Sequence, residues 1–218
     1  MRYITMLLLV LVSQLALSTP TNPVNGSEYT TIGTPQATTT SGKKIEVIEF
    51  FMYHCPACNM LEPALMTWVK KQGDNIQFKR IHVPHSAAKD PEAHLFLTLE
   101  AMQLEDNLHA KVLHTWHVEH HQLLSDQDNI DWAIKNGIER EKFLSFYNSF
   151  SVLNKLQNLP RVASSYTVDS TPTIVIDGHY LTSLALVDAS KPGIAQTELV
   201  GVTLQVMDAL VVKAQAGK

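Results

Sequence analysis

The sequence predicts a single mixed α/β sheet that is interrupted by a block of helices. A strand, a helix and a second strand follow one another over residues 45–83, an order that implies two parallel strands joined by a right-handed crossover. Helical patterns then fill residues 90–165, after which a hairpin and one last helix return to the sheet. The predicted fold class is therefore α/β, with a mixed central sheet and an inserted all-helical region.

The composition favours a folded chain with a substantial core. The chain has 218 residues, of which 45% are hydrophobic and 17% are charged, and these proportions argue against extensive disorder. The formal net charge is −4. A mildly acidic chain lacks the basic surface that nucleic-acid-binding domains use, so a function in DNA or RNA binding is set aside.

The N-terminal residues are typical of a secretory signal peptide. Arg2 precedes a nearly continuous apolar run over residues 4–17, and small residues follow that run. The run is short for a helix that spans a bilayer, which needs about 20 residues. We therefore predict a cleaved signal peptide over residues 1–18 and export of the remaining chain. A flexible segment is predicted over 19–42, where 29–32 can add a short edge strand.

The first strand and the first helix flank a pair of cysteines. Residues 45–51 are rich in β-branched and aromatic types and are apolar on both faces apart from two glutamates, as in a central strand. From Pro56 the apolar residues recur at helical spacing, and proline suits the first turn of a helix. Pro63 lies within this helix and is expected to kink it. A second strand is predicted over 77–83.

Five helices are predicted in the middle of the chain, because apolar residues recur at helical spacing in each of five segments. Asp128 is a candidate N-cap of the third helix, and Gly137 is a candidate stop after it. The five segments are 91–103, 108–117, 129–135, 140–147 and 152–165.

The C-terminal part of the chain returns to strands. Residues 173–176 and 179–181 flank Asp177 and Gly178, a dipeptide that favours two-residue hairpin turns. We expect this hairpin to add antiparallel edge strands to the sheet. An amphipathic helix over about 196–214 completes the pattern.

Cys55 and Cys58 are the only two cysteines of the chain, and their spacing indicates redox chemistry. Exported proteins normally use cysteines for structural disulfides, whose stabilising effect grows with the length of the closed loop. A bridge between Cys55 and Cys58 closes almost no loop, and strained, exposed disulfides are the labile and catalytic ones. Metal binding is the competing interpretation, but structural zinc needs four ligands and the chain has no second pair of cysteines.

These features together resemble the DsbA family of periplasmic dithiol oxidases, which have a thioredoxin fold with an inserted helical domain. The resemblance covers about residues 45–215. It rests on the helical block and on two motifs, namely Phe50-Phe51-x-x-x-Cys55-Pro56-x-Cys58 and Val168-Asp169-Ser170-Thr171-Pro172-Thr173. It implies a first thioredoxin-like part over 43–88, an inserted helical domain over 89–158 and a second thioredoxin-like part over 159–218.

The resemblance implies a catalytic role for three residues. Cys55 and Cys58 form the redox-active disulfide, with Cys55 as the nucleophile and Cys58 as its shielded partner. A helix N-terminus favours negative charge, so its position lowers the pKa of Cys55 and stabilises the reduced thiolate. Glu49 is the buried acid beneath the cysteines that assists proton transfer, with Arg80 as a candidate charge partner. The alternative for Glu49 is a solvated carboxylate at the sheet edge.

The resemblance also implies a substrate-binding set beside the cysteines. Thr171 and Pro172 form a cis peptide bond, and the Thr171 backbone pairs with an extended client peptide. An ordinary proline at the start of a strand is the alternative. His54, Pro56 and Ala57 complete the set, and well-studied family members carry histidine in place of Ala57, a difference that bears on the redox potential. His54 as an imidazolium can lower the pKa of Cys55, or it can be a variable surface residue.

The predicted function is that of a monomeric periplasmic dithiol oxidase, which needs no cofactor and introduces disulfide bonds into reduced, unfolded exported proteins. The resemblance implies reoxidation by a DsbB-like membrane protein. Three alternatives stay open at this point. They are a reductase or isomerase of the same fold, a peptide-binding chaperone without catalysis, and a metal-binding protein that uses the cysteines with His114, His117 and His121, which share a face if their helix continues.

Overall fold

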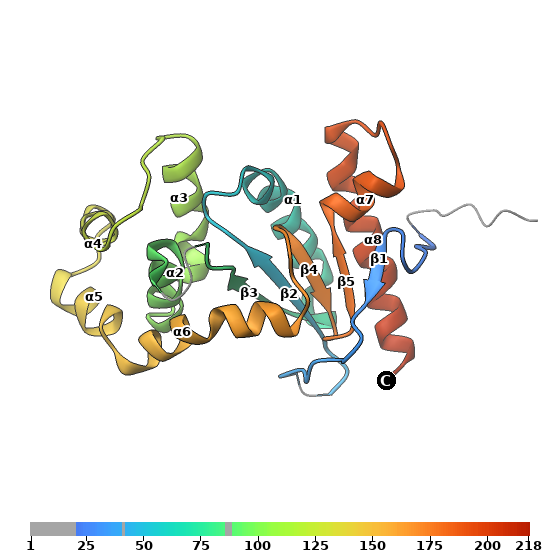
Figure 1. Ribbon diagram of the computed structural model, residues 1–218, viewed down its shortest axis with the longest axis horizontal. Helices are drawn as coiled ribbons and strands as arrows, with labels where there is room; N and C mark the ends of the chain where they lie inside the picture. The colour runs from blue at the N-terminus through green and yellow to red at the C-terminus, as the bar shows by residue number, and fades with distance from the viewer. Residues whose placement is uncertain (1–20, 41, 86–88) are drawn as a thin grey trace, which may run out of the picture.

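The computed structural model describes residues 21–40, 42–85 and 89–218, so the predicted signal peptide over 1–18 lies outside the described residues. The strands form a mixed sheet in the order β1-β5-β4-β2-β3, in which only β2 and β3 are parallel neighbours. A helical block projects from one side of this sheet (Figure 1). The predicted α/β fold class with a helical insertion is therefore confirmed. The strands are β1 Tyr29–Thr31, β2 Ile45–Phe51, β3 Ile76–His82, β4 Thr173–Ile176 and β5 Tyr180–Ser183.

The helices follow the predicted order, with boundaries that move by one turn or less. One helix was not predicted. In α7 the apolar residues that follow β5 look like a continuation of that strand, but the Ser183 side chain caps the backbone N–H of Leu186 and starts a helix. The helices are α1 Pro56–Gln72, α2 Pro91–Ala101, α3 Glu105–His117, α4 Asp126–Lys135, α5 Arg140–Tyr147, α6 Phe150–Ser165, α7 Leu184–Ser190 and α8 Gln196–Ala216, with a short 3-10 turn η1 at Gly73–Asn75.

Strand β2 is the central element of the sheet, as predicted. It lies between β4 and β3, and all seven of its residues are buried. Ile45 and Val47 pack in one cluster with α1 and α8, whereas Ile48 and Phe50 pack in another with Tyr166, which follows α6. Because successive residues of a strand face opposite sides, Glu49 lies on the same face as α1.

The C-terminal hairpin does not form the edge of the sheet, and that prediction is wrong. Strand β4 pairs with β2, and β5 is covered by the N-terminal strand β1. Tyr29 and Ile32 are both buried, so this part of the predicted flexible segment 19–42 is packed against the fold. Gly178 in the hairpin turn accepts a backbone hydrogen bond from Gln36 at 2.9 Å. A Cβ at Gly178 would collide with the Gln36 carbonyl, so the close approach requires glycine.

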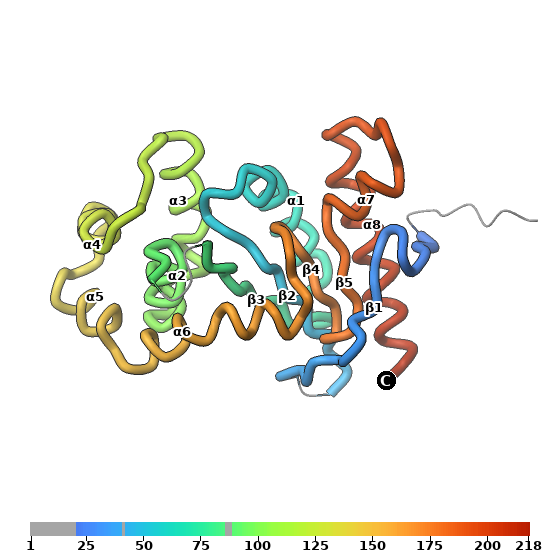
Figure 2. Tube along the Cα trace, viewed as in Figure 1, coloured from blue at the N-terminus to red at the C-terminus, as the bar shows by residue number. Residues whose placement is uncertain are grey.

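The helical block has its own hydrophobic core, which continues into the end of β2. Helix α2 lies in the middle of the block and contacts α3, α4, α5 and α6 (Figure 2). Ser125 caps α4 by accepting a hydrogen bond from the backbone N–H of Asp128, so the prediction of Asp128 as the N-cap is wrong. Gly137 does follow the end of this helix, with a φ of 84°.

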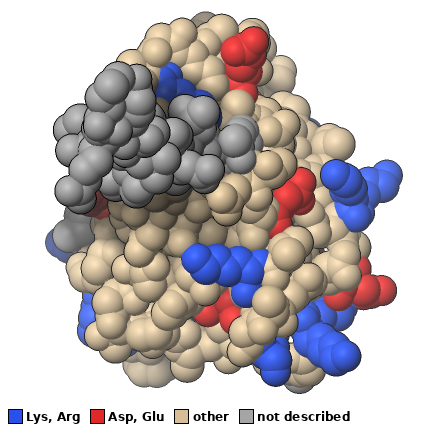
Figure 3. Space-filling view, turned by 90° about the vertical axis from the view of Figure 1, so that its right-hand side faces the viewer, with Lys and Arg blue, Asp and Glu red and all other residues tan. Residues whose placement is uncertain are grey.

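Helix α8 is long and apolar enough to cross a membrane by length and composition alone. One of its faces nevertheless packs on the sheet through Val206, Met207 and Leu210, which are fully buried. The side of the molecule that carries β1 and α8 shows Lys and Arg interspersed with Asp and Glu (Figure 3). This mixture of signs agrees with the small net charge.

Candidate active site

Strand β2 delivers Cys55 to the N-terminus of α1. Cys55 has an extended backbone and is the N-cap residue, and its sulfur accepts a hydrogen bond from the backbone N–H of Cys58 at 3.3 Å. Pro56 occupies the first turn of the helix, where its missing N–H leaves no bond unmade. Both cysteines are free thiols in this structure. Cys55 is 6% exposed and Cys58 only 2% exposed, so Cys58 is the more shielded of the two.

The pKa values of the two thiols are shifted in opposite directions. The Cys58 thiol donates to the Cys55 sulfur and lowers the pKa of Cys55 to about 5, against the effect of burial and with help from Thr171 and from backbone N–H groups. Burial and the neighbouring Cys55 sulfur raise the pKa of Cys58. At neutral pH the reduced pair therefore holds a thiolate at Cys55 and a protonated thiol at Cys58.

The Thr171–Pro172 peptide bond lies against the nucleophile and is cis, as predicted. The Cys55 sulfur lies 3.4 Å from the Thr171 carbonyl oxygen. Pro172 is followed directly by β4, which pairs with β2. The sheet pairing therefore brings this loop and the cysteine pair together from distant parts of the sequence.

Glu49 is buried beneath the cysteine pair rather than solvated at an edge. Its carboxylate is 3.1 Å from Nε of Arg80, its neighbour on β3, so the predicted charge partner is confirmed. Burial raises the pKa of Glu49 to about 7, although the Arg80 cation acts in the opposite direction. The Glu49 carboxylate also contributes to the raised pKa of Cys58. Glu49 is thus close enough to sense the charge of the shielded thiol.

Arg80 is the centre of a larger buried cluster that was not predicted. Besides Glu49, its guanidinium contacts Glu62 of α1 at 2.9 Å and Glu105 of α3 at 3.0 Å. His109 lies 3.1 Å from Glu105, one helical turn further along α3. In the sequence these side chains look like the solvated faces of two helices, and only the packing of α1 on β3 and of α3 on α1 reveals them as buried partners. The cluster ties the sheet to the helical block.

His54 is also bound to the helical block, although it was considered as a possible variable surface residue. Its ring Nδ1 is 2.7 Å from one carboxylate oxygen of Glu92 in α2, and its backbone N–H donates to the other oxygen at 2.9 Å. Glu92 was not predicted, because an acidic residue in the first turn of a helix is usually explained by the helix dipole. His54 therefore has a defined partner beside the nucleophile.

The histidine run does not form a metal site in the way the helical spacing suggested. Helix α3 ends at His117, so His121 lies beyond the shared face. His114 lies 3.4 Å from Glu119, whereas His117 Nε2 lies 2.8 Å from the Tyr53 carbonyl. Within residues 21–40, 42–85 and 89–218, no group of three His, Cys, Asp or Glu side chains is arranged to hold a metal ion. The metal-binding alternative gains no support from this part of the chain.

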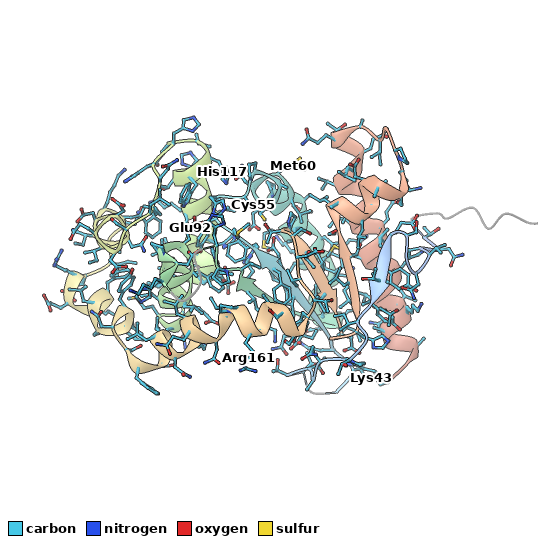
Figure 4. All side chains as sticks on the ribbon, viewed as in Figure 1. Lys43, Cys55, Met60, Glu92, His117 and Arg161 are labelled. Atoms are coloured by element: carbon cyan, nitrogen blue, oxygen red, sulfur yellow. The ribbon has the colours of Figure 1, made fainter. Side chains whose placement is uncertain are left out.

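A cavity of about 400 Å³ borders the nucleophile on the side of the helical block. It is lined by His54 and Pro56, which flank Cys55, and by Trp116 and His117 from the end of α3. Figure 4 shows His117, Glu92 and Cys55 together at the junction of the block and the sheet. His54 and Pro56 therefore line a cavity beside the nucleophile, and their role in client binding stays a prediction.

Replacing Glu49 with glutamine should change how stability depends on pH. A carboxyl whose folded-state pKa is raised destabilises the protein as pH rises from the ordinary value of 4.5 to about 7. The free energy of unfolding of Glu49→Gln, relative to the parent chain, should therefore increase across this window, by roughly 3 kcal/mol at most. Denaturant unfolding at pH 5 and pH 8 measures the difference. An equal effect of the substitution at both pH values would contradict a raised pKa.

The fold and the cysteine pair define the class of protein. A family profile described as Thioredoxin matches residues 25–191. Within that range the strand β2 leads into a helix with Cys55 as its N-cap and Cys58 in its first turn, and a cis-proline loop lies against Cys55. The protein is a thiol:disulfide oxidoreductase with a thioredoxin fold and an inserted helical region.

Similar proteins show which family within this class the chain belongs to. The chain is 34% identical over 213 residues to the thiol:disulfide interchange protein DsbA of Burkholderia cepacia, covering 98% of this chain and 96% of the relative. It is 33% identical over 200 residues to that of Bordetella pertussis, covering 91% and 90%. The crystal structure of Pseudomonas aeruginosa DsbA superimposes with a TM-score of 0.77 at 30% identity, covering 88% of this chain and 94% of that one. The chain belongs to the DsbA family.

Proposed function

We propose that this protein oxidises pairs of thiols in reduced, unfolded exported proteins, with Cys55 as the nucleophilic sulfur and Cys58 as its resolving partner. The observation that carries the proposal is the difference between the two thiols. Cys55 lies at the helix N-terminus with a pKa lowered to about 5, whereas Cys58 is shielded and has a raised pKa. A stabilised thiolate favours the reduced form of the pair, which makes its disulfide an oxidant.

The first step is an attack by a client thiolate on the Cys55 sulfur of the oxidised pair. The Cys55–Cys58 bond breaks, a mixed disulfide forms between the client and Cys55, and Cys58 leaves with the electron pair. Because burial makes a Cys58 thiolate unfavourable, it takes up a proton. Glu49 lies beneath the pair with a pKa of about 7, so its carboxyl can supply that proton at neutral pH.

The second step releases the oxidised client. Another client thiolate attacks the client sulfur of the mixed disulfide, and Cys55 leaves as a thiolate because its pKa is low. The client gains one disulfide bond, and the two electrons remain on the cysteine pair. An extended client segment can pair with the Thr171 backbone beside Cys55, and His54 and Pro56, which line the neighbouring cavity, together with Ala57 would contact the same client.

The proposed site of action is the periplasm. The N-terminal sequence has the pattern of an export signal, and the relatives are named thiol:disulfide interchange proteins. The reduced pair then needs an electron acceptor to work again, and a DsbB-like membrane oxidase is the proposed one. The proposed domain limits follow the sequence, with the helical domain over 89–158 between thioredoxin-like parts over 43–88 and 159–218.

Two measurements test the proposal together. Alkylation of Cys55 as a function of pH should show a thiolate forming several units below the usual value of 9.0, because only the thiolate reacts. The oxidised protein should also speed disulfide formation in a reduced, unfolded client with a known number of cysteines. A Cys55 that ionises like a free cysteine, or a strongly reducing potential against glutathione, would favour the reductase alternative instead.

A further inference from the structure

A carboxylate from the helical block holds the residue that immediately precedes the nucleophile. Glu92 contacts both the backbone N–H and the ring Nδ1 of His54. The Glu92 side chain is 5% exposed, whereas that of His54 is 31% exposed. Figure 4 shows Glu92 of α2 beside Cys55, although 37 positions separate them in the sequence. Glu92, which is nearly buried, therefore connects the helical block to the residue just before Cys55 and α1.

This contact favours charge on both partners. The hydrogen bond to Glu92 raises the pKa of His54 above its usual 6.5, against the effect of burial. Burial acts to raise the pKa of Glu92, but hydrogen bonds from His54 and His82 outweigh it and hold that pKa at about 2. Glu92 thus stays ionised throughout the pH range in which Cys55 and His54 titrate.

Other titratable groups around the His54 ring come from every neighbouring element. They are His82 of β3, His85 after β3, Asp90 before α2, His117 at the end of α3 and Cys55 before α1. Asp90 and the Cys55 thiolate add to the effect of Glu92 in raising the pKa of His54. By linkage, a charged His54 must favour the Cys55 thiolate by the same free energy.

We propose that Glu92 is a positioning residue for the disulfide chemistry, which holds the His54 imidazole beside Cys55 through its two hydrogen bonds and so couples the helical block to the charge on the nucleophile. The inference rests on the proposed role of Cys55. The two partners should have opposite effects on the Cys55 thiolate, since an imidazolium at His54 would stabilise it and the Glu92 carboxylate would destabilise it. Neither residue touches the reacting bond, and each acts through the Cys55 thiolate.

Two conservative substitutions separate this role from simple structural support. His54→Asn keeps a side-chain N–H for Glu92 but removes the positive charge, so the pKa of Cys55 should rise. Glu92→Gln keeps an acceptor for His54 but removes the negative charge, so the pKa of Cys55 should fall. Each shift should be about half a unit to one unit, the size expected for one charge a few ångström away in a partly solvated site.

The measurement is alkylation of the reduced full-length protein against pH, for the parent chain and both variants. The reduction potential against glutathione should move in step, with a roughly threefold to tenfold change in the equilibrium constant for each variant. If Glu92 and His54 only supported the backbone before Cys55, both variants would instead shift the pKa of Cys55 in the same direction, toward that of a free cysteine. Shifts of the same sign, or no shift in either variant, would overturn the proposal.

The His54 ring provides a second readout that activity does not affect. Its pKa, followed by NMR, should be higher in the reduced protein, which holds the Cys55 thiolate, than in the oxidised protein. Glu92→Gln should lower it in both states. Equal values in the two redox states would show that His54 and Cys55 are not coupled. If the parent chain has a low Cys55 pKa and neither variant changes it, only this inference is wrong. If the Cys55 pKa of the parent chain is that of an ordinary cysteine, the proposed function itself is wrong.

Discussion

Replacing Cys58 with alanine should stop turnover and trap the protein as a mixed disulfide with its client through Cys55. The variant cannot form its internal disulfide, but its Cys55 thiolate can still attack an oxidised client or be activated by an added oxidant. No neighbouring thiol then displaces the client. The trapped species should be seen as a covalent complex on non-reducing gels that a reductant dissolves, with client oxidation lowered by at least about a hundredfold, since exchange then lacks its adjacent partner.

The matched control is Cys55→Ala. Cys58 is more shielded and has a raised pKa, so this variant should neither oxidise clients nor trap them. Retained oxidase activity in Cys55→Ala, or trapping through Cys58 alone, would contradict the assignment of Cys55 as the nucleophile. The same pair of variants also tests the chaperone alternative, because client binding that survives both substitutions unchanged does not depend on redox chemistry.

Replacing Arg80 with methionine should destabilise the fold strongly. The substitution keeps most of the side-chain length but leaves Glu49, Glu62 and Glu105 without the cation that contacts all three. Removing one partner from a buried ion cluster leaves uncompensated charge and costs about 3–5 kcal/mol. The loss should be larger at pH 8 than at pH 5, because the carboxyls can take up protons at the lower pH. Denaturant unfolding at the two pH values measures both effects.

Lys155→Met is the control for this prediction. Lys155 lies 2.8 Å from Glu100, but its side chain is 52% exposed and that of Glu100 is 43% exposed. Water screens such a pair, so its loss should change the free energy of unfolding by no more than about 1 kcal/mol. If the two substitutions had similar effects, the Arg80 cluster would not be the buried electrostatic centre that the structure indicates.

Local patterns in the sequence were sufficient to predict most elements and the central chemistry. The strand before Cys55, the helix that begins at Pro56 and the turn at Asp177 and Gly178 all depend on neighbouring residues. Their predictions were confirmed because backbone preference and hydrophobic spacing act over a few positions. The buried position of Glu49 and its contact with Arg80 were anticipated from family resemblance together with the strand pattern.

The features that escaped prediction depend on distant parts of the chain. Glu92 becomes the partner of His54 only when the start of α2 lies beside the start of α1, and Glu105 reaches Arg80 only when α3 packs on α1. A short edge strand was expected over 29–32, but the hairpin was also predicted at an edge, because nothing near it in sequence reveals that the 29–31 strand pairs with β5. In each case the signal is a contact between segments, which hydrophobic periodicity does not encode.

The pairing of β1 with β5 has a consequence for biogenesis. A chain made from its N-terminus presents Tyr29–Thr31 early, yet their partners at 180–182 follow only about 150 residues later. The backbone groups of β1 thus stay open to pairing with other chains until β5 has been made. A product that ends before β5 leaves β1 unmatched, and one that lacks β1 leaves β5 as a ready template for aggregation. The sheet can therefore close at this side only in a chain that carries both segments.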